Sequence, residues 1–544
     1  MIPWPRRLRN LIIRALIRAI SLLYPPIDAL FSRIRSSPGV PINNPCTSYW
    51  SLHPSPISRH AANGNLPKYA DVVVIGSGIT GTSFARAILD YDALHGVTGK
   101  PLRVLMLEAR DVCSGATGRN GGHITPMLYH DYTELKAAHG IDMARKIILF
   151  RLCHFQELLS VATEENLLEE AQCREVEALD AFYEPSLYNE AKGKLETYKK
   201  DLPEESSRYQ IYEGSDKIKN LQLSCLTVGC ISTRGGAMHP YRLVTGILAR
   251  LLRVYPSNFY LFSHTPCTSI SGPESVGGHQ LYSLETPKGT IQTPHVVHAT
   301  NAWASHLIPG MREKIIPARG VMTAQGPRPG LGEGSKKKRP TTWTSQRSFV
   351  FYPSNSFDVY DYLTQQPVAN SAVSTYPKSA GELMFGGGFG RDNGFLTEVG
   401  NVDDSRWNSR TASYLQGALS DYFKVDDNES KEEVKATWGG ILGISVDQQP
   451  WVGRIPATIT GRGSVFWGAP TATDLAAPGE WMAAGYTGEG MVHAWQSGKA
   501  LAYMVLGLDE GGILDWLPEV FRISEERWKD AEIEDLIASF LNLK

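Results

Sequence analysis

Three glycines stand at a spacing that lets a phosphate group approach the main chain closely. Gly76, Gly78 and Gly81 follow directly after the apolar run at residues 72–75, and a helical pattern covers residues 82–89. In a strand, turn and helix of this kind, the first glycine permits the turn and the second lets the backbone reach a pyrophosphate, while the third lets the helix pack on the strand. The N-terminus of the helix then offers unpaired N–H groups and a partial positive charge to the anion.

A second strand and an acid complete this pattern. The strand expected at residues 103–107 is followed by Glu108, whose carboxylate can accept hydrogen bonds from the ribose hydroxyls of an adenosine. An acid here also argues against a 2′-phosphate, and therefore against NADP. The order of strand, glycines, helix, strand and acid predicts a dinucleotide site rather than an ordinary glycine-rich turn.

The run of small residues at 114–122, Ser-Gly-Ala-Thr-Gly-Arg-Asn-Gly-Gly, decides between FAD and NAD. Such a run cannot build a core, but it can lie against a large planar ligand and supply backbone N–H groups. With this run the chain resembles the FAD-dependent amine and amino-acid oxidoreductases of the D-amino-acid oxidase superfamily, in particular the glycine oxidase, sarcosine oxidase and γ-glutamylputrescine oxidase branch. The resemblance implies FAD as the cofactor.

Length and composition set the broad class. With 544 residues the chain exceeds one ordinary core, so two domains are expected. The 54 basic residues are balanced by 56 acidic ones, and nothing in the composition indicates a nucleic-acid partner. The seven cysteines show neither a CxxC motif nor metal-ligand spacing, so we expect no metal site and a reducing, intracellular compartment.

The first 24 residues differ from the rest of the chain. They carry five arginines among leucines and isoleucines, with no acid. The spacing predicts a basic amphipathic helix that is too short and too charged to span a membrane. Three interpretations stay open: a mitochondrial transit peptide, a helix on an anionic membrane surface, and an exposed structural helix or tail.

A Pro/Ser/Asn-rich arm follows at residues 36–65. In it, Ser48-Tyr49-Trp50 resembles an element that precedes the first strand in the γ-glutamylputrescine oxidase-like branch. The alternative is that the two aromatic residues only pin the arm to the surface.

The rest of the chain predicts an α/β protein, α+β overall. A helical stripe at residues 131–168, a β-meander at 258–298 and an alternating aromatic segment at 349–366 supply its elements. We expect a Rossmann-like FAD-binding domain with a β-meander, and a discontinuous substrate domain on a mostly antiparallel sheet with helices. The expected ranges are 1–70 for the basic helix and arm, 71–135, 225–304 and 436–507 for the FAD-binding domain, 136–224 and 305–435 for the substrate domain, and 508–544 for a C-terminal helical tail.

Later stretches resemble further signatures of the family, among them residues 299–303, 317–320, 438–453 and 485–491. The resemblance implies that the last of these sets backbone N–H groups and a helix N-terminus against the pyrimidine end of the flavin, where the reduced ring carries negative charge. The cofactor-binding residues that the motifs and the resemblance imply are Gly76, Gly78, Ile79, Thr80, Gly81, Glu108, Ala109, Arg110, Gly115, Ala116, Thr117, Asn120, Gly121, Gly122, Thr300, Trp303, Gly485, Tyr486, Thr487, Gly488, Gly490 and Met491.

The chemistry that the resemblance implies is hydride transfer from a substrate C–H to flavin N5, with an imine as the product from an amine. The partners are then a small-molecule substrate and either O2 or another electron acceptor. The candidate catalytic residues are Arg119, His123 and Tyr362. Arg119 would pair a carboxylate or the pyrophosphate, and His123 would accept a proton or attach the flavin covalently. A structural role stays open for Arg119 and His123, and core packing stays open for the segment of Tyr362.

Some positions depart from the family pattern. Val492 stands where sarcosine oxidase-like members carry a lysine that holds the substrate carboxylate, and Glu489 replaces a histidine common in the turn. No cysteine lies near this signature, so a cysteinyl flavin is not expected. These changes weaken the case for an amino-acid substrate. The alternatives are oxidation of a hydroxyl carbon in a sugar or secondary-metabolite precursor, and a flavin-binding protein without catalysis.

Replacing Gly78 by a bulky residue is expected to abolish FAD binding, because the side chain would stand where the pyrophosphate approaches the backbone. The ratio of flavin to protein in the purified variant measures this. A variant that keeps stoichiometric flavin would show that the pyrophosphate does not lie at this turn.

Overall fold

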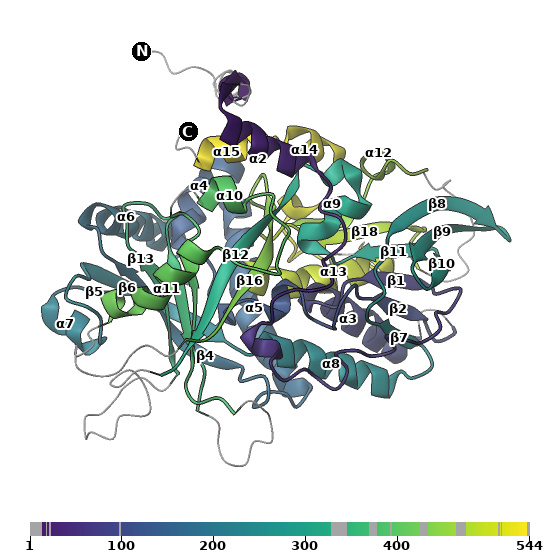
Figure 1. Ribbon diagram of the computed structural model, residues 1–544, viewed down its shortest axis with the longest axis horizontal. Helices are drawn as coiled ribbons and strands as arrows, with labels where there is room; N and C mark the ends of the chain where they lie inside the picture. Colours follow the sequence, from purple (N-terminus) through teal and green to yellow (C-terminus); the bar gives the residue numbers. More distant parts are fainter. Residues whose placement is uncertain are drawn as a thin grey trace.

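The computed structural model describes residues 14–17, 19–20, 23–96, 99–327, 345–368, 378–391, 394–423, 434–463, 475–509, 512 and 514–540. Their strands form three β-sheets, of six, three and nine strands, with helices packed around them (Figure 1). Parallel and antiparallel pairings both occur, so the architecture is mixed α/β, as the sequence predicts.

The six-stranded sheet has the order β17-β18-β11-β1-β2-β7, and every neighbouring pair is parallel except β17 with β18. Helices α3, α8 and α13 pack against it. The bounds of these elements are β1 Val72–Ile75, β2 Val104–Leu107, β7 Phe259–Phe262, β11 His295–His298, β17 Trp451–Arg454, β18 Gly479–Ala484, α3 Ile79–His95, α8 Pro240–Val254 and α13 Ala494–Val505.

Strand β1 is apolar at every position because both faces of its sheet are covered. Val72 and Val74 pack in one cluster with Phe84 of α3. Val73 and Ile75 pack in another cluster with Leu284 of β9. Alternate side chains of a strand point to opposite faces, so α3 and the three-stranded sheet lie on opposite sides of β1.

The three-stranded sheet is an antiparallel meander of β8 (Ser269–Val276), β9 (His279–Thr286) and β10 (Gly289–Thr293). It is shorter than the meander expected at residues 258–298. Of the two end segments, β7 pairs in parallel with β2 instead. β11 pairs in parallel with β1, which agrees with its β-branched run, because such a run suits a strand that returns to the nucleotide-binding sheet.

The nine-stranded sheet has the order β16-β12-β15-β14-β13-β4-β6-β3, with β5 also paired to β6. It is antiparallel throughout except for the pair β13 and β4, which agrees with the mostly antiparallel sheet expected. Its strands are β3 His123–Ile124, β4 Arg174–Phe182, β5 Gln210–Tyr212, β6 Gly229–Ala237, β12 Ile315–Gln325, β13 Arg347–Tyr352, β14 Asp361–Gln365, β15 Leu383–Gly387 and β16 Val434–Ser445.

Three strands of the nine-stranded sheet, β3, β6 and β16, lie wholly or mostly in ranges that the sequence assigns to the FAD-binding domain. The long antiparallel ladders of β6 with β4 and of β16 with β12 hold the latter two strands in this sheet, and β3 pairs with β6. The division into domains itself stays a prediction.

The helical stripe expected at residues 131–168 is divided at Gly140, where φ is +83°. Helix α5 carries the buried stripe of Ile147, Phe150 and Leu158 at helical spacing. The helices outside the parallel sheet are α4 Tyr129–His139, α5 Ile141–Glu164, α6 Pro185–Asp201, α7 Ser215–Asn220, α9 Ala304–Leu307, α10 Gly394–Glu398, α11 Ser409–Tyr422, α12 Ala457–Thr460 and α14 Glu525–Asp530.

Near the N-terminus, α2 (Pro25–Arg35) lies beside α15 (Ile533–Phe540) from the other end of the chain (Figure 1). Arg14 pairs with Asp535 at 2.6 Å, and Ile17 is buried in the same cluster as α2. Most of the basic segment expected to be a helix, namely residues 1–13, 18 and 21–22, lies outside the described residues. Across the described ranges, the helices are all too short or too polar to pass through a bilayer.

A buried carboxylate joins the two large sheets and the arm. Asp404 is 0% exposed. Arg110 Nη1 donates to both of its carboxylate oxygens, to Oδ1 at 3.0 Å and to Oδ2 at 2.9 Å. Arg119 Nε lies 3.6 Å from the same Oδ2. The backbone oxygen of Asp404 accepts a hydrogen bond from Cys46 N of the arm at 2.8 Å. Burial lowers the pKa of Arg119, and the Asp404 charge opposes that shift. We call these four residues the Asp404 cluster.

Removing the Asp404 side chain is expected to destabilise the fold strongly. Asp404→Ala leaves two buried guanidinium groups without their anion, a loss of about 3–5 kcal/mol. The apparent melting temperature, followed by tryptophan fluorescence, should fall by several degrees. The matched control is Asp403→Ala, because Asp403 pairs with the exposed Arg406 and such pairs contribute at most about 1 kcal/mol. Equal melting temperatures of the two variants would contradict this role of Asp404.

Candidate active site

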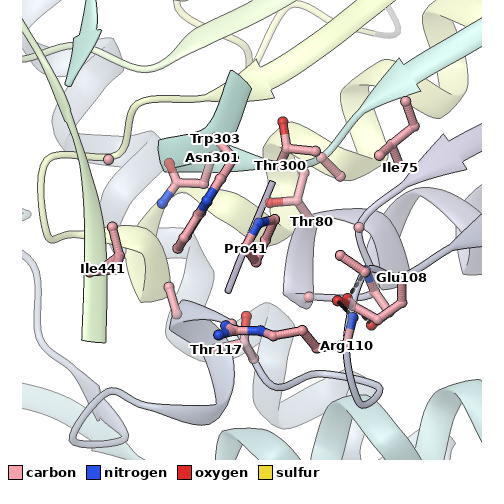
Figure 2. Close-up of a pocket in the computed structure, with 18 of the residues that line it drawn as sticks. Pro41, Ile75, Thr80, Glu108, Arg110, Thr117, Thr300, Asn301, Trp303 and Ile441 are labelled. Carbon is pink, nitrogen blue, oxygen red and sulfur yellow. Dashed lines mark hydrogen bonds between the residues drawn. The ribbon is translucent and has the colours of Figure 1, made fainter. Parts of the chain in front are cut away.

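Distant segments of the chain meet around one cavity at the carboxyl ends of the parallel strands (Figure 2). Ile75 and Leu107, the last residues of β1 and β2, line it together with Ala299, which follows β11. Ligands of open α/β sheets lie at this edge, where the strand order reverses. The reversal occurs next to β1, which has β2 on one side and β11 on the other.

The turn after β1 shapes one wall of the cavity. Gly76 has φ of +110°, and a Cβ atom there would lie 2.5 Å from the carbonyl oxygen of Ala299. Gly78 is the N-cap of α3 and lines the cavity with Ile79 and Thr80, the first residues of the helix. The helix N-terminus therefore faces the cavity with its partial positive charge, as an anion site requires.

Gly81 does not line the cavity. A Cβ atom there would lie 2.1 Å from the carbonyl oxygen of Gly76. Glycine is therefore required for the close contact of α3 with the turn, which is the packing role expected from the sequence.

Glu108 lies at the end of β2 and lines the cavity, as does Ala109. Its Oε2 accepts hydrogen bonds from Ser77 N at 3.2 Å and Ser77 Oγ at 2.6 Å, while Oε1 accepts one from Arg110 N at 3.0 Å. A carboxylate offers about four acceptor positions, so capacity remains for ribose hydroxyls. These bonds hold the carboxylate beside the phosphate turn.

The glycine-rich run contributes the next wall, with Gly115, Ala116, Thr117 and Asn120 lining the cavity. Thr117 Oγ1 accepts a hydrogen bond from Ile79 N at 3.0 Å, which ties the run to the first turn of α3. Gly121 and Gly122 are buried behind it. A Cβ atom at Gly121 would lie 2.7 Å from Tyr362, and one at Gly122 would lie 2.1 Å from the carbonyl oxygen of Met238.

Thr300 and Trp303 line the opposite side, in and next to the short helix η3 (Asn301–Trp303). Thr300 Oγ1 and Trp303 Nε1 are buried, and neither atom has a hydrogen-bond partner among the described residues. Buried polar atoms are normally paired, so these two call for a polar ligand. Together with the glycine walls and Glu108, they fit a dinucleotide such as FAD.

The last wall is the turn before α13, where Tyr486, Gly488, Gly490 and Met491 line the cavity. Tyr486 OH lies 2.9 Å from Thr80 Oγ1, so this turn contacts the phosphate turn directly. The turn passes through the short helix η5 (Gly490–Val492) before α13 begins.

Gly485 and Thr487 lie outside the lining, although the resemblance implies them. Gly485 N donates to Asn301 Oδ1 at 2.9 Å, and Thr487 Oγ1 accepts from Ser445 N at 3.1 Å. Both residues hold the turn in place rather than face the cavity.

Sequence reasoning missed several lining residues. Asn301 and the middle of β16 stand inside stretches that resemble family signatures, whereas the arm and the segments after β7 and η3 carry no motif for a ligand. The missed residues are Gly39, Val40, Pro41, Ile75, Ser77, Leu107, Thr265, Pro266, Cys267, Ala299, Asn301, His306, Leu307, Ile441, Leu442, Gly443 and Ala494.

His123 and Tyr362 come together, but they do not line this cavity. Their rings are stacked with centroids 6.2 Å apart, and Tyr362 OH donates to Met322 Sδ at 2.9 Å. His123 Nε2 is buried and has no hydrogen-bond partner in the part of the chain that the structure describes. Burial lowers the pKa of His123 to about 4 and raises the pKa of Tyr362, so both are neutral near pH 7.

Arg119 is fully engaged within the protein. Its Nε donates to Ser114 O at 2.8 Å, Nη1 to Gly439 O at 2.7 Å and Nη2 to Cys46 O at 2.7 Å. It lies outside the cavity lining, and these contacts support a structural role. Arg110 does line the cavity, yet its guanidinium is held by Asp404.

A buried cluster behind the last turn had no counterpart among the expected catalytic residues. Arg151 of α5 donates through Nη1 to Asp131 Oδ2 at 2.8 Å and to Met127 O at 2.7 Å, and through Nε to His493 Nε2 at 3.3 Å. Its Nη2 lies 3.5 Å from Glu489 Oε2. Burial raises the pKa of Glu489, and the Arg151 charge opposes that shift. Two features of the sequence point to this cluster: Glu489 lies inside a glycine-rich turn, and Arg151 lies inside the apolar stripe of α5.

His154 connects α5 to α13 next to this cluster and is 0% exposed. Its Nδ1 lies 2.7 Å from Phe150 O and therefore carries the proton, while its Nε2 accepts from Gln496 N at 3.3 Å. The bond that Nε2 accepts requires a neutral ring, because a protonated imidazole has no acceptor nitrogen. Burial lowers the pKa of His154 to about 4. These contacts support a packing role for His154.

Comparisons with known proteins agree with this geometry. A model of the family described as FAD dependent oxidoreductase, DAO, matches residues 71–504. The probable oxidoreductase OrdL of Rhizobium meliloti (strain 1021) is 23% identical over 448 residues, which cover 80% of this chain and 83% of that protein.

Solved structures show the same fold. Glycine oxidase from Geobacillus kaustophilus matches with a TM-score of 0.58 at 16% identity, over 84% of this chain and 99% of that one. L-proline dehydrogenase from P. horikoshii matches with a TM-score of 0.57 at 18% identity, over 86% of this chain and 100% of that one.

The neutral His154 predicts a loss of stability in acid. Its pKa is about 4 in the folded state and about 6.5 when unfolded, so the unfolded state binds the extra proton first as the pH falls. This stabilisation is present above pH 6.5 and is lost towards pH 4. At pH 5 the loss from this residue is about 2 kcal/mol relative to pH 8.

Denaturant unfolding at pH 8 and pH 5 measures this loss. In His154→Gln, the free energy of unfolding should fall by about 2 kcal/mol less between these pH values than in the wild type. His279→Gln is the control, because His279 is exposed on the surface. The same pH dependence in His154→Gln and the wild type would refute this assignment.

Proposed function

Because the chain belongs to the DAO family of FAD-dependent oxidoreductases, we propose that it oxidises a carbon atom bearing nitrogen in an amine or amino acid. The observation that carries the proposal is that the phosphate turn, Glu108, the glycine-rich run and the turn at Gly488–Gly490 all line one cavity. These are the walls that a bound FAD requires from its pyrophosphate to its ring.

The protein's first task is to hold the cofactor. The backbone at Gly78 and Ile79 would bind the pyrophosphate, and Glu108 would bind the adenosine ribose. The segments around Ile441 and Gly490 would hold the ring end, since they line the part of the cavity built by the last turn. When bound, FAD supplies an acceptor for the hydride that leaves the substrate.

We propose that His123 and Tyr362 form the substrate side of the ring end. They lie directly behind the glycine-rich run, because Tyr362 is in contact with Gly121. The unpartnered Nε2 of His123 is an acceptor for a substrate N–H. A pKa of about 4 keeps this nitrogen unprotonated near pH 7, so it orients an amine without adding a charge.

An amine must also lose its ammonium proton before its carbon releases hydride. Glu489 belongs to the turn whose neighbouring residues, Gly488 and Gly490, line the cavity. Burial raises the pKa of its carboxyl group towards the range of a proton acceptor. In the proposed scheme the ammonium proton passes to the Glu489 carboxylate. Arg151 then orients that carboxylate through its contact at 3.5 Å.

The arginines near this end favour an amine over an amino acid. Arg119 and Arg151 are both occupied by protein groups, and Val492 offers no charge. A substrate carboxylate would therefore have to displace one of these contacts. The names glycine oxidase and L-proline dehydrogenase refer to amino acids, which supports a nitrogen-bearing substrate in general.

The proposal is tested by reducing the bound flavin without oxygen. Secondary and primary amines, D- and L-amino acids, and then sugars and polyols are added to the purified protein while the flavin absorbance is recorded. Bleaching by an amine, with a carbonyl product after hydrolysis of the imine, is the expected result. Reduction by dithionite is the control that the flavin is accessible to a reductant.

Two other results would overturn the proposal. Bleaching by hydroxyl compounds alone would assign the enzyme to oxidation of a hydroxyl carbon. A yellow protein that dithionite reduces but no organic donor does would indicate a flavin-binding protein without this catalysis.

A further inference from the structure

We propose that the arm at residues 36–65 is part of the FAD site, where it closes over the adenosine half of the cofactor and slows its release. The arm precedes residue 71, at which the match to the family begins. The proposal concerns how the cofactor is held, and it does not depend on which substrate is oxidised.

Three consecutive residues of the arm belong to the wall of the cavity. Gly39, Val40 and Pro41 line the cavity, and Figure 2 shows Pro41 drawn among the lining side chains. The other lining residues of this part come from the segments after β7 and η3, namely Thr265, Pro266, Cys267, His306 and Leu307.

These residues lie at the adenosine end. Thr265 N donates to the carbonyl oxygen of Glu108 at 2.8 Å, so the segment after β7 is beside the acid that would bind the ribose. Ser37 Oγ of the arm lies 3.1 Å from His306 Nδ1. Arg110 Nη1 donates to the carbonyl oxygen of Ile42, which follows Pro41, at 3.5 Å, and Arg110 N donates to Glu108. The arm therefore reaches the end of the cavity at which Glu108 lies.

The arm is anchored before it reaches the cavity. Helix α2 buries Ile27, Leu30 and Phe31 in one cluster with residues of the second large sheet. Arg33 Nε donates to Val399 O at 3.2 Å, and Arg33 Nη2 donates to Leu396 O. The helix thus fixes the start of the arm at residue 36.

The arm is anchored again directly after the cavity. Cys46 belongs to the Asp404 cluster and also accepts a hydrogen bond from Gly439 N on its Sγ at 3.2 Å. Trp50 Nε1 donates to Asn120 O at 2.5 Å, and so holds the glycine-rich run that lines the cavity. A segment fixed on both sides forms a standing wall, and no other chain segment has to move to make it.

The chemistry of this wall suits a purine. Val40 and Pro41 present apolar side chains, and Val40 remains 38% exposed, so its surface is available to a ligand. Proline also restricts the backbone, which helps to keep this wall in place before the cofactor binds. Burial of a purine face against these side chains should slow dissociation.

The test compares FAD release from the full-length holoprotein carrying Val40→Ser and Pro41→Ser with release from the wild type. Flavin fluorescence after dilution reports the release rate. We expect about a tenfold faster release in the double variant, which corresponds to about 1.4 kcal/mol. The single Val40→Ser variant should show a smaller change in the same direction, and it alters a side chain that is already partly exposed.

Displacement of FAD by ADP shows which half of the cofactor the arm contacts. ADP shares the adenosine and lacks the flavin, so an arm that binds adenosine weakens both ligands equally. At a fixed, saturating concentration of FAD, the ADP concentration that displaces half of the bound FAD should then be the same in the double variant as in the wild type, because both ligands are weakened by the same factor. The rate of FAD release is nevertheless faster in the double variant. Easier displacement by about tenfold would mean that the arm acts on the flavin half and would overturn the proposal.

Leu52→Ser is the matched control. Leu52 lies on the same arm, is 45% exposed and does not line the cavity. FAD should leave the Leu52→Ser holoprotein at the same rate as it leaves the wild type. Unchanged release in the double variant, or equal acceleration in the Leu52→Ser control, would refute a specific contact between the arm and the cofactor.

Discussion

The pairing of buried charge at Asp404 is the constraint on which the rest of the structure depends. Two guanidinium groups, Arg110 and Arg119, are almost fully buried and need an anion, and one carboxylate serves both. Arg110 follows the acid that ends β2, and Arg119 lies within the glycine-rich run. Asp404 comes from the segment between α10 and α11, so the pairing fixes the cofactor walls against the second large sheet.

The cavity itself follows from close approaches of backbone to backbone. The turn at Gly76 contacts Ala299 after β11, and Gly81 contacts Gly76, at distances that leave no room for a side chain. These contacts bring the N-terminus of α3 to the carboxyl ends of the strands. The unpartnered polar atoms of Thr300 and Trp303 then remain for a ligand, which is why the site has the character of a cofactor site rather than of a packed core.

The ring end differs from the phosphate end in its electrostatics. At the phosphate end a helix N-terminus provides partial positive charge. Behind the last turn, Arg151 is surrounded by Asp131, Glu489 and His493, so its charge is balanced within the protein. Neutral His123 and Tyr362 add polarity without charge. In the proposed scheme, the anionic pyrophosphate lies at the first end, and an uncharged amine reacts at the second.

The sequence by itself determined the elements whose pattern is local. Val72–Ile75, the three glycines and Glu108 lie within one strand–turn–helix–strand unit, so their spacing predicts their structure. The same spacing predicts that Gly76, Gly78 and Glu108 line the cavity. The residues of the run at 115–120 that line the cavity were predicted for the same reason. Tertiary structure alone decided what depends on long-range pairing. It placed β6 and β16 in the nine-stranded sheet, directed Arg119 into contacts with Cys46 and Gly439, and brought the arm to the cavity. These outcomes rest on partners hundreds of residues apart, and no local spacing encodes which partner a strand edge or a buried charge will meet.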